Sequence, residues 1–299
     1  LTKNIDSINL GINLSEATAI SGARSGVMNH LPIDIPHNEG ALKHIKVLVR
    51  EGCVVGKSVY PYSSSVSTTN ISDRVINGVQ TIMNEVFPGT GMAEGALTGN
   101  VSAAVISGYD PRKKNRYISQ IIAGKAGGPG TDGHDGYVVY NAPCVGGGMT
   151  PLSVEQLEQQ YPLLITQNEI RTDAIACGEY DSAPAMRVGF TPTTNEPVVF
   201  SYFGDGIYNA PKGACGGEDS TLARNYIYKI EKGFECRRIL PSVAAQEVKK
   251  GEIIGSDGPS GGAFGDPLNR EPDKVRHRAR EGWISVQKAA DVYGVVICT

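Results

Sequence analysis

The segment Gly130–Gly136 holds two carboxylates and an imidazole, on Asp132, His134 and Asp135, with glycines on either side. Carboxylate and imidazole side chains can orient a water molecule or transfer a proton, and glycines allow a ligand to approach the backbone closely. We therefore predict catalytic roles for Asp132, His134 and Asp135. The alternative is a tight turn in which the two aspartates accept hydrogen bonds from their own backbone.

A second candidate site lies at Thr69 and Asn70, directly before a helix that is expected to begin near Ser72. A hydroxyl, an amide and the free N–H groups of a helix start together suit an anionic group such as a phosphate or a carboxylate. Arg74 is expected in the first turn, where a cation opposes the helix dipole and needs a negatively charged partner. We predict that Thr69, Asn70 and Arg74 bind substrate. The alternative is a plain helix cap with Arg74 paired to a surface acid.

Composition argues against several classes of partner. The 299 residues carry 28 basic and 31 acidic side chains, a net charge of -3, so no strong field favours nucleic acid or an anionic membrane surface. No apolar run approaches the roughly 20 residues that a membrane span needs. The six cysteines are far apart, without a C-x-x-C pair, so we predict no metal site in this chain and free thiols in the cytoplasm.

The elements that must position these residues are short, because the chain has 37 glycines and 17 prolines. Apolar spacing predicts one helix from Ser15 to His30 with Ser15 as its N-cap, and a second from Ser72 to the Pro88-Gly89 pair. A third helix should begin at Ser153, where Gln156 completes a capping box. Runs of β-forming residues predict strands at 44–49, 117–123, 137–140, 186–190, 198–203 and 223–230.

These elements predict an α+β fold that is rich in strands and glycine. We divide it into an α+β part at 1–165, a mostly antiparallel β unit at 166–265 and a helical tail at 266–299. The tail should contain one short helix around Val275 and another that Ser285 caps and Gly294 ends.

The tail also carries a family resemblance. Pro259–Leu268, Arg270–Pro272, Glu281–Ser285 and Tyr293–Val296 together resemble the closing segment of the B-type subunits of hydantoinases, oxoprolinases and ketone carboxylases. Further segments follow in the family's order upstream, so the resemblance extends over nearly the whole chain: Ile35–Gly40, Val66–Arg74, Val105–Pro111, Gly127–Gly133 and Glu158–Leu163.

The resemblance implies a multi-subunit enzyme. In this family, an A-type partner binds ATP and phosphorylates the substrate, and the B-type subunit then carries out hydrolysis or carboxylation. Complete B-type subunits are longer, and their N-terminal part holds a divalent metal (Zn, Mn or Mg). The chain looks like the C-terminal half of such a subunit. Its start at Leu1, without the features of a secretory signal, fits a longer polypeptide.

The resemblance thus implies that the chain is part of the catalytic B-type subunit of an ATP-dependent cyclic amide hydrolase acting on a hydantoin or an oxoproline-like ring. The implied partners are an A-type subunit and the N-terminal half of the B-type subunit, in a cytoplasmic hetero-oligomer that takes a small-molecule substrate. Two alternatives remain open, a ketone carboxylase of the acetone or acetophenone type and a non-catalytic assembly subunit.

Overall fold

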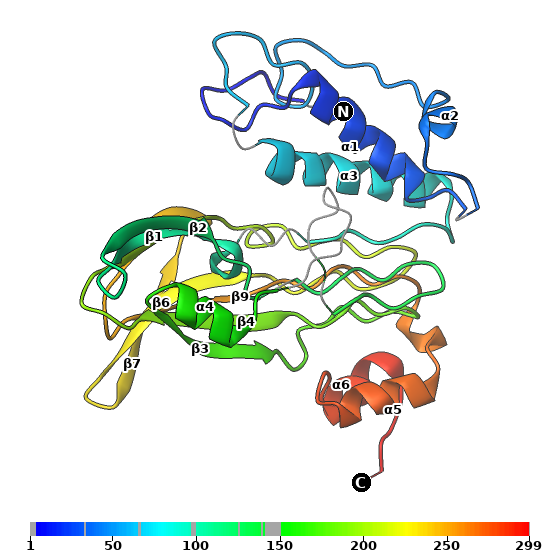
Figure 1. Ribbon diagram of the computed structural model, residues 1–299. Coiled ribbons are helices and arrows are strands. Elements are labelled where there is room, and N and C mark those ends of the chain that lie inside the picture. The colour runs from blue at the N-terminus through cyan, green and yellow to red at the C-terminus, as the bar shows by residue number, and fades with distance from the viewer. Residues whose placement is uncertain are drawn as a thin grey trace.

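The structure is a computed structural model that describes residues 4–32, 34–64, 67–96, 100–124, 126–138, 140 and 151–298, with the backbone alone at 67–70. It has the predicted α+β fold. Two antiparallel sheets form its centre, the long helices α1 and α3 lie side by side on one side of them, and the short helices α5 and α6 lie on the other side near the C-terminus (Figure 1).

The two sheets of the described chain combine strands that are distant in sequence. One sheet has four strands in the order β2 (Asn115–Gln120), β1 (Val105–Asp110), β5 (Val198–Phe203) and β8 (Val243–Val248). The other has five, in the order β3 (Leu163–Ile170), β4 (Met186–Pro192), β9 (Ile253–Asp257), β6 (Arg224–Glu231) and β7 (Phe234–Leu240). Strands from before and after residue 165 therefore share the first sheet.

The main core lies between these sheets. Alternate side chains of each sheet point to it, and Phe190 of β4 meets Phe200 of β5 with ring centroids 5.7 Å apart. Both rings are fully buried, as are Ile106 of β1 and Ile254 of β9. Burial of this kind contributes roughly 1.5–3 kcal/mol for each large side chain, so the sandwich gives the surrounding loops a rigid base.

Serine caps define three of the helices. Helix α1 (Glu16–Met28) and helix α4 (Val154–Gln160) begin after the predicted caps Ser15 and Ser153, whose hydroxyls accept hydrogen bonds from Thr18 and Gln156. The tail contains the predicted helices α5 (Pro272–Arg280) and α6 (Val286–Tyr293). Two 3-10 turns, Val101–Ala103 and Pro267–Asn269, and a short helix α2 (Glu39–Leu42) complete the set. Within the described ranges, no helix has the length and apolar character of a membrane span.

Three local predictions were wrong. Helix α3 (Ser67–Val86) begins five residues before the predicted start at Ser72. Residues 44–49 and 137–138 have no strand partner, and Tyr140 forms only an isolated bridge with Ala126. A β-forming run becomes a strand only when another strand lies beside it, and Leu48, at 85% exposed, has no such neighbour.

The cap of α6 gives a test of the tail's stability. Ser285 accepts a hydrogen bond from Lys288 N at 3.1 Å, and Gly294 ends the helix in the left-handed conformation. We expect Ser285→Ala to lower the free energy of unfolding by about 1 kcal/mol, because one helix N–H loses its partner. Urea unfolding would measure this, and an unchanged midpoint would show that the cap does not contribute.

Candidate functional site

The first predicted site is a turn whose backbone is fixed and whose side chains are exposed. Thr131 N donates to His134 O at 2.9 Å, and His134 N donates to Thr131 O at 3.1 Å. Asp132 N donates to Gly91 O at 2.9 Å, which attaches the turn to the segment after α3. Asp132 and His134 are both exposed. The turn therefore presents a carboxylate and an imidazole to solvent from a backbone that neighbouring segments hold in place.

Asp135, the third predicted catalytic residue, has a different environment. Its Oδ1 accepts hydrogen bonds from Arg270 Nη1 at 2.7 Å and from Asp181 N at 2.9 Å. Its Oδ2 accepts from Arg270 Nη2 at 2.8 Å and from Arg278 Nη2 at 3.0 Å. Burial opposes ionisation of Asp135, but the hydrogen bonds and charges of the two arginines outweigh it and lower the pKa of this carboxyl. Asp135 thus joins the turn to the helical tail.

A second buried carboxylate completes this network. Asp181 is fully buried, and its Oδ1 accepts from Tyr293 Oη at 2.7 Å and from Gly178 N at 3.1 Å. Arg270 Nε lies 3.2 Å from Asp181 Oδ2. Burial raises the pKa of Asp181 to about 6 despite the nearby Arg270 charge. Burial also raises the pKa of the neighbouring Cys177 thiol to about 12, so this cysteine stays protonated and unreactive.

Closely packed glycine loops carry the turn. Gly130 N donates to Gly262 O, and Ala93 N donates to Gly130 O, so three loops run side by side. A Cβ atom at Gly130 would overlap the carbonyl oxygen of Tyr180. Only glycine lets these backbones approach so closely, which explains why the candidate residues lie in a glycine-rich segment.

The second predicted site lies on helix α3. Arg74 Nη2 forms an ion pair with Asp205 Oδ2 at 3.1 Å and donates to Gly95 O at 3.3 Å. Arg74 Nε is buried and has no hydrogen-bond partner among the described residues. Because α3 begins at Ser67, Arg74 lies in the second turn and not in the predicted first turn. The side chains of Thr69 and Asn70 lie outside the described residues.

The buried polar face of α3 was not recognised from the sequence. Asn77 donates to Gly95 O at 2.8 Å and accepts from Gly95 N at 3.2 Å. Gln80 is fully buried, and neither its amide oxygen nor its nitrogen has a hydrogen-bond partner in the described ranges. Buried amides normally find partners, so a polar face of this kind marks α3 as more than a packing helix.

The two predicted sites meet the same segment of chain. The turn is bonded to Gly91 and Arg74 is bonded to Gly95, so both contact the segment 91–95 that follows α3. Glu94 in this segment accepts from Thr81 Oγ1 at 2.9 Å and from Lys212 N at 3.0 Å. The segment therefore links helix α3, the Thr131–His134 turn and the glycine loops.

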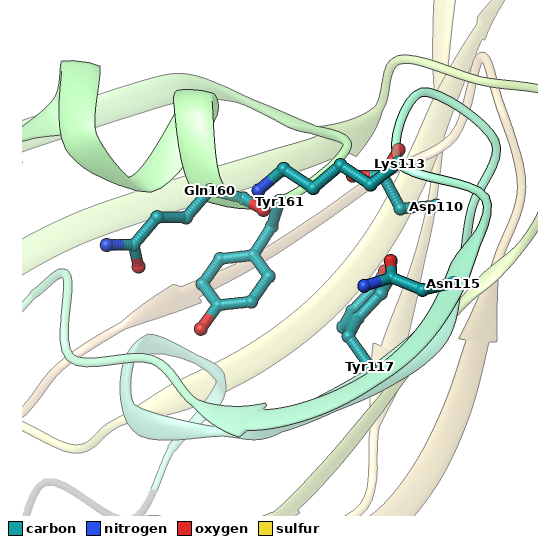
Figure 2. Close-up of a pocket in the computed structure, with 6 residues that line it drawn as sticks. All are labelled: Asp110, Lys113, Asn115, Tyr117, Gln160 and Tyr161. Carbon is teal, nitrogen blue, oxygen red and sulfur yellow. Dashed lines mark hydrogen bonds between the residues drawn. The ribbon is translucent and has the colours of Figure 1, made fainter.

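A separate pocket lies between the β1–β2 hairpin and the C-terminal end of α4. Figure 2 shows Lys113 reaching from the hairpin towards Gln160 and Tyr161, with Tyr117 opposite. The pocket has a volume of about 200 Å³, and Lys113 Nζ donates to Gln160 O at 2.9 Å. Burial raises the pKa of Tyr117 to about 12. A cation at a helix C-terminus stabilises the last carbonyls, so these contacts tie α4 to the hairpin.

Metal ligands were not predicted for this chain. Within the ranges that the structure covers, no three His, Cys, Asp or Glu side chains gather in a way that could hold a metal ion. The five described cysteines are free thiols. The described residues therefore do not provide a metal site of their own.

Comparisons with known proteins agree with the resemblance of the tail. The family model described as Hydantoinase B/oxoprolinase matches residues 1–267. The chain is 27% identical over 291 residues to the beta subunit of caprolactamase from Pseudomonas jessenii, which covers 96% of this chain and 49% of that protein. It is also 27% identical over 270 residues to the B-type subunit of a D-/L-hydantoinase from Pseudomonas sp. (strain NS671), covering 88% of this chain and 42% of that protein.

Solved structures share the fold. The crystal structure of ATP-dependent caprolactamase from Pseudomonas jessenii has a TM-score of 0.82 at 24% identity, covering 99% of this chain and 51% of that chain. Nucleotide-free acetone carboxylase has a TM-score of 0.72 at 17% identity, covering 96% and 42%. The chain spans about half the length of these relatives. Because the family model covers most of its residues, the chain belongs to the hydantoinase B/oxoprolinase family.

Proposed function

We propose that the chain is part of the B-type subunit of an ATP-dependent cyclic amide hydrolase. The observation that carries this proposal is the 27% identity to the caprolactamase beta chain over 96% of the chain described here. The hydantoinase relative has the same identity over 88% of the chain. Caprolactam and hydantoin both contain an amide closed in a ring, so the shared substrate class is a cyclic amide.

The partners follow from the length of the relatives. We propose that the chain works with an A-type subunit and with the remaining half of its own B-type subunit in a hetero-oligomer. The A-type partner would bind ATP, and ATP would supply the phosphoryl group that activates the ring amide. A divalent metal (Zn, Mn or Mg) would belong to the other half of the B-type subunit, since the described residues do not form a metal site. The free thiols favour a cytoplasmic location.

The residues of this chain would hold and protonate the substrate. We assign proton transfer to Asp132 and His134, which are exposed on the turn, and positioning of the turn to Asp135, whose oxygens are occupied by arginines. Arg74 has an Nε donor without a partner among the described residues and would bind an anionic group on the activated substrate. Thr69 and Asn70 precede it on α3 and would add a hydroxyl and an amide.

Ketone carboxylation is the second candidate. The acetone carboxylase structure shares the fold with this chain at a TM-score of 0.72, but its 17% identity supports no conclusion about the reaction. A third candidate is a non-catalytic assembly subunit. The presence of Asp132 and His134 on an exposed turn argues against that role.

The test is an assay of the assembled enzyme. The chain would be produced with the rest of its subunit and an A-type partner, and the complex would be checked by native mass spectrometry. ATP hydrolysis would be measured with caprolactam, hydantoin, 5-oxoproline, acetone and acetophenone, each with and without bicarbonate. We expect stimulation by a cyclic amide without bicarbonate. Stimulation by a ketone only with bicarbonate would establish the carboxylase, and an ATP-silent complex would favour the assembly role.

A further inference from the structure

The helical tail, residues 266–299, docks on the rest of the molecule through contacts that do not involve the Thr131–His134 turn. Ile175 and Cys177 pack with Val275, Ile284 and Ala289 in a small core of their own. Polar contacts surround it: Ser285 N donates to Asp173 Oδ1 at 2.7 Å, Asp173 N donates to Trp283 O at 2.9 Å and Lys288 Nζ donates to Ile175 O at 2.9 Å. The tail therefore has a defined position before any contact with Asp135 is considered.

Two arginines extend from this fixed tail to Asp135. The Arg270 side chain is 1% exposed and also donates from Nη1 to Glu179 O at 2.9 Å. The Arg278 guanidinium lies over the Trp283 ring at 4.3 Å from its centroid, and its side chain is 11% exposed. A planar guanidinium that is packed and bonded on several sides has little freedom to rotate. Arg270 and Arg278 thus fix the Asp135 carboxylate in orientation as well as in distance.

Asp135 passes this constraint to the turn, because it directly follows His134 in the chain. On its other side, Gly136 N donates to Asp181 O at 2.8 Å. The side chains of Asp132 and His134 are exposed, so the backbone around them sets where they point. A catalytic group displaced by about 1 Å can lose about 10²-fold in rate, so a turn of this kind needs an external anchor.

We infer that the helical tail acts as a clamp that sets the position of the Thr131–His134 turn, with Arg270 and Arg278 as positioning residues that act through Asp135. This inference rests on the proposed function only where it concerns turnover. The physical clamp can be tested without any substrate.

The test uses Arg278→Gln in the assembled enzyme, because Arg270 then still holds Asp135 and the tail keeps its own core. We expect backbone amides of residues 131–136 to exchange hydrogen about tenfold faster, while amides of α6 keep their protection. We also expect kcat and kcat/KM on a cyclic amide to fall together by about 10²-fold with KM unchanged. Arg278→Lys keeps a charge and a donor, and should restore part of the lost turnover.

Arg276→Gln is the matched control. Arg276 lies on the same helix, is exposed and pairs only 3.2 Å away with the exposed Asp273, so its loss should change neither exchange nor turnover. Unchanged exchange at 131–136 in Arg278→Gln would overturn the clamp, and so would faster exchange there with turnover unchanged. Faster exchange in an assembled enzyme that does not act on any cyclic amide would overturn the proposed function and leave the physical clamp standing.

Discussion

Replacing Arg270 with methionine is expected to lower the free energy of unfolding by about 3–5 kcal/mol, because two carboxylates then lose their main cationic partner. Asp181 is fully buried and Asp135 is partly buried, so water cannot replace the lost guanidinium at both. Methionine has a similar length and fills much of the space, so the loss would come from charge and hydrogen bonding. Urea unfolding with a fixed m-value would measure the change.

The control for this prediction is Arg276→Met on the same helix as Arg278. Arg276 is exposed, and we expect its loss to change the free energy of unfolding by less than about 0.5 kcal/mol. The double variant Arg270→Met/Asp135→Asn should recover part of the stability, because it removes one of the unpaired carboxylates. If Arg270→Met unfolded at the wild-type urea concentration, the buried ion pairs would not stabilise the tail.

The second large effect concerns turnover. Asp132→Asn and His134→Ala are each expected to lower kcat of the assembled enzyme by about 10²–10⁴-fold, the range for loss of a general acid or base. Both side chains are exposed, so the free energy of unfolding should change by less than about 0.5 kcal/mol. Steady-state assays on a cyclic amide would measure kcat, and native mass spectrometry would show that the complex still assembles.

His277→Ala is the matched control for the imidazole. His277 is exposed on α5, outside the predicted site, and should retain wild-type kcat. Wild-type kcat in both Asp132→Asn and His134→Ala would exclude the turn from catalysis. Loss of the complex in either variant would show instead that the turn contributes to assembly.

Local features were well predicted from the sequence, since their causes lie within a few residues. Ser15, Ser153 and Ser285 cap helices because a side-chain hydroxyl accepts the hydrogen bond of a backbone N–H three residues later. Strand β5 has the predicted bounds, 198–203, since its alternating β-forming residues suit a half-buried strand. The family assignment was also confirmed, because an ordered series of motifs survives at low overall identity.

Features that depend on distant neighbours could not be predicted in this way. The start of α3 and the absence of a strand at 44–49 follow from packing, which local propensity does not contain. The catalytic roles of Asp132 and His134 remain predictions, because turnover depends on partner chains as well as on this turn.

Asp135 shows the difference most clearly. The sequence determined that a glycine-rich loop carries two carboxylates and an imidazole, and that a helical tail with several arginines ends the family's pattern. Only the tertiary structure decided that Arg270, 135 residues away, and Arg278, 143 residues away, bind the same carboxylate. The physical reason is that an ion pair depends on where the fold places two side chains, and the sheets and glycine loops between them set that distance.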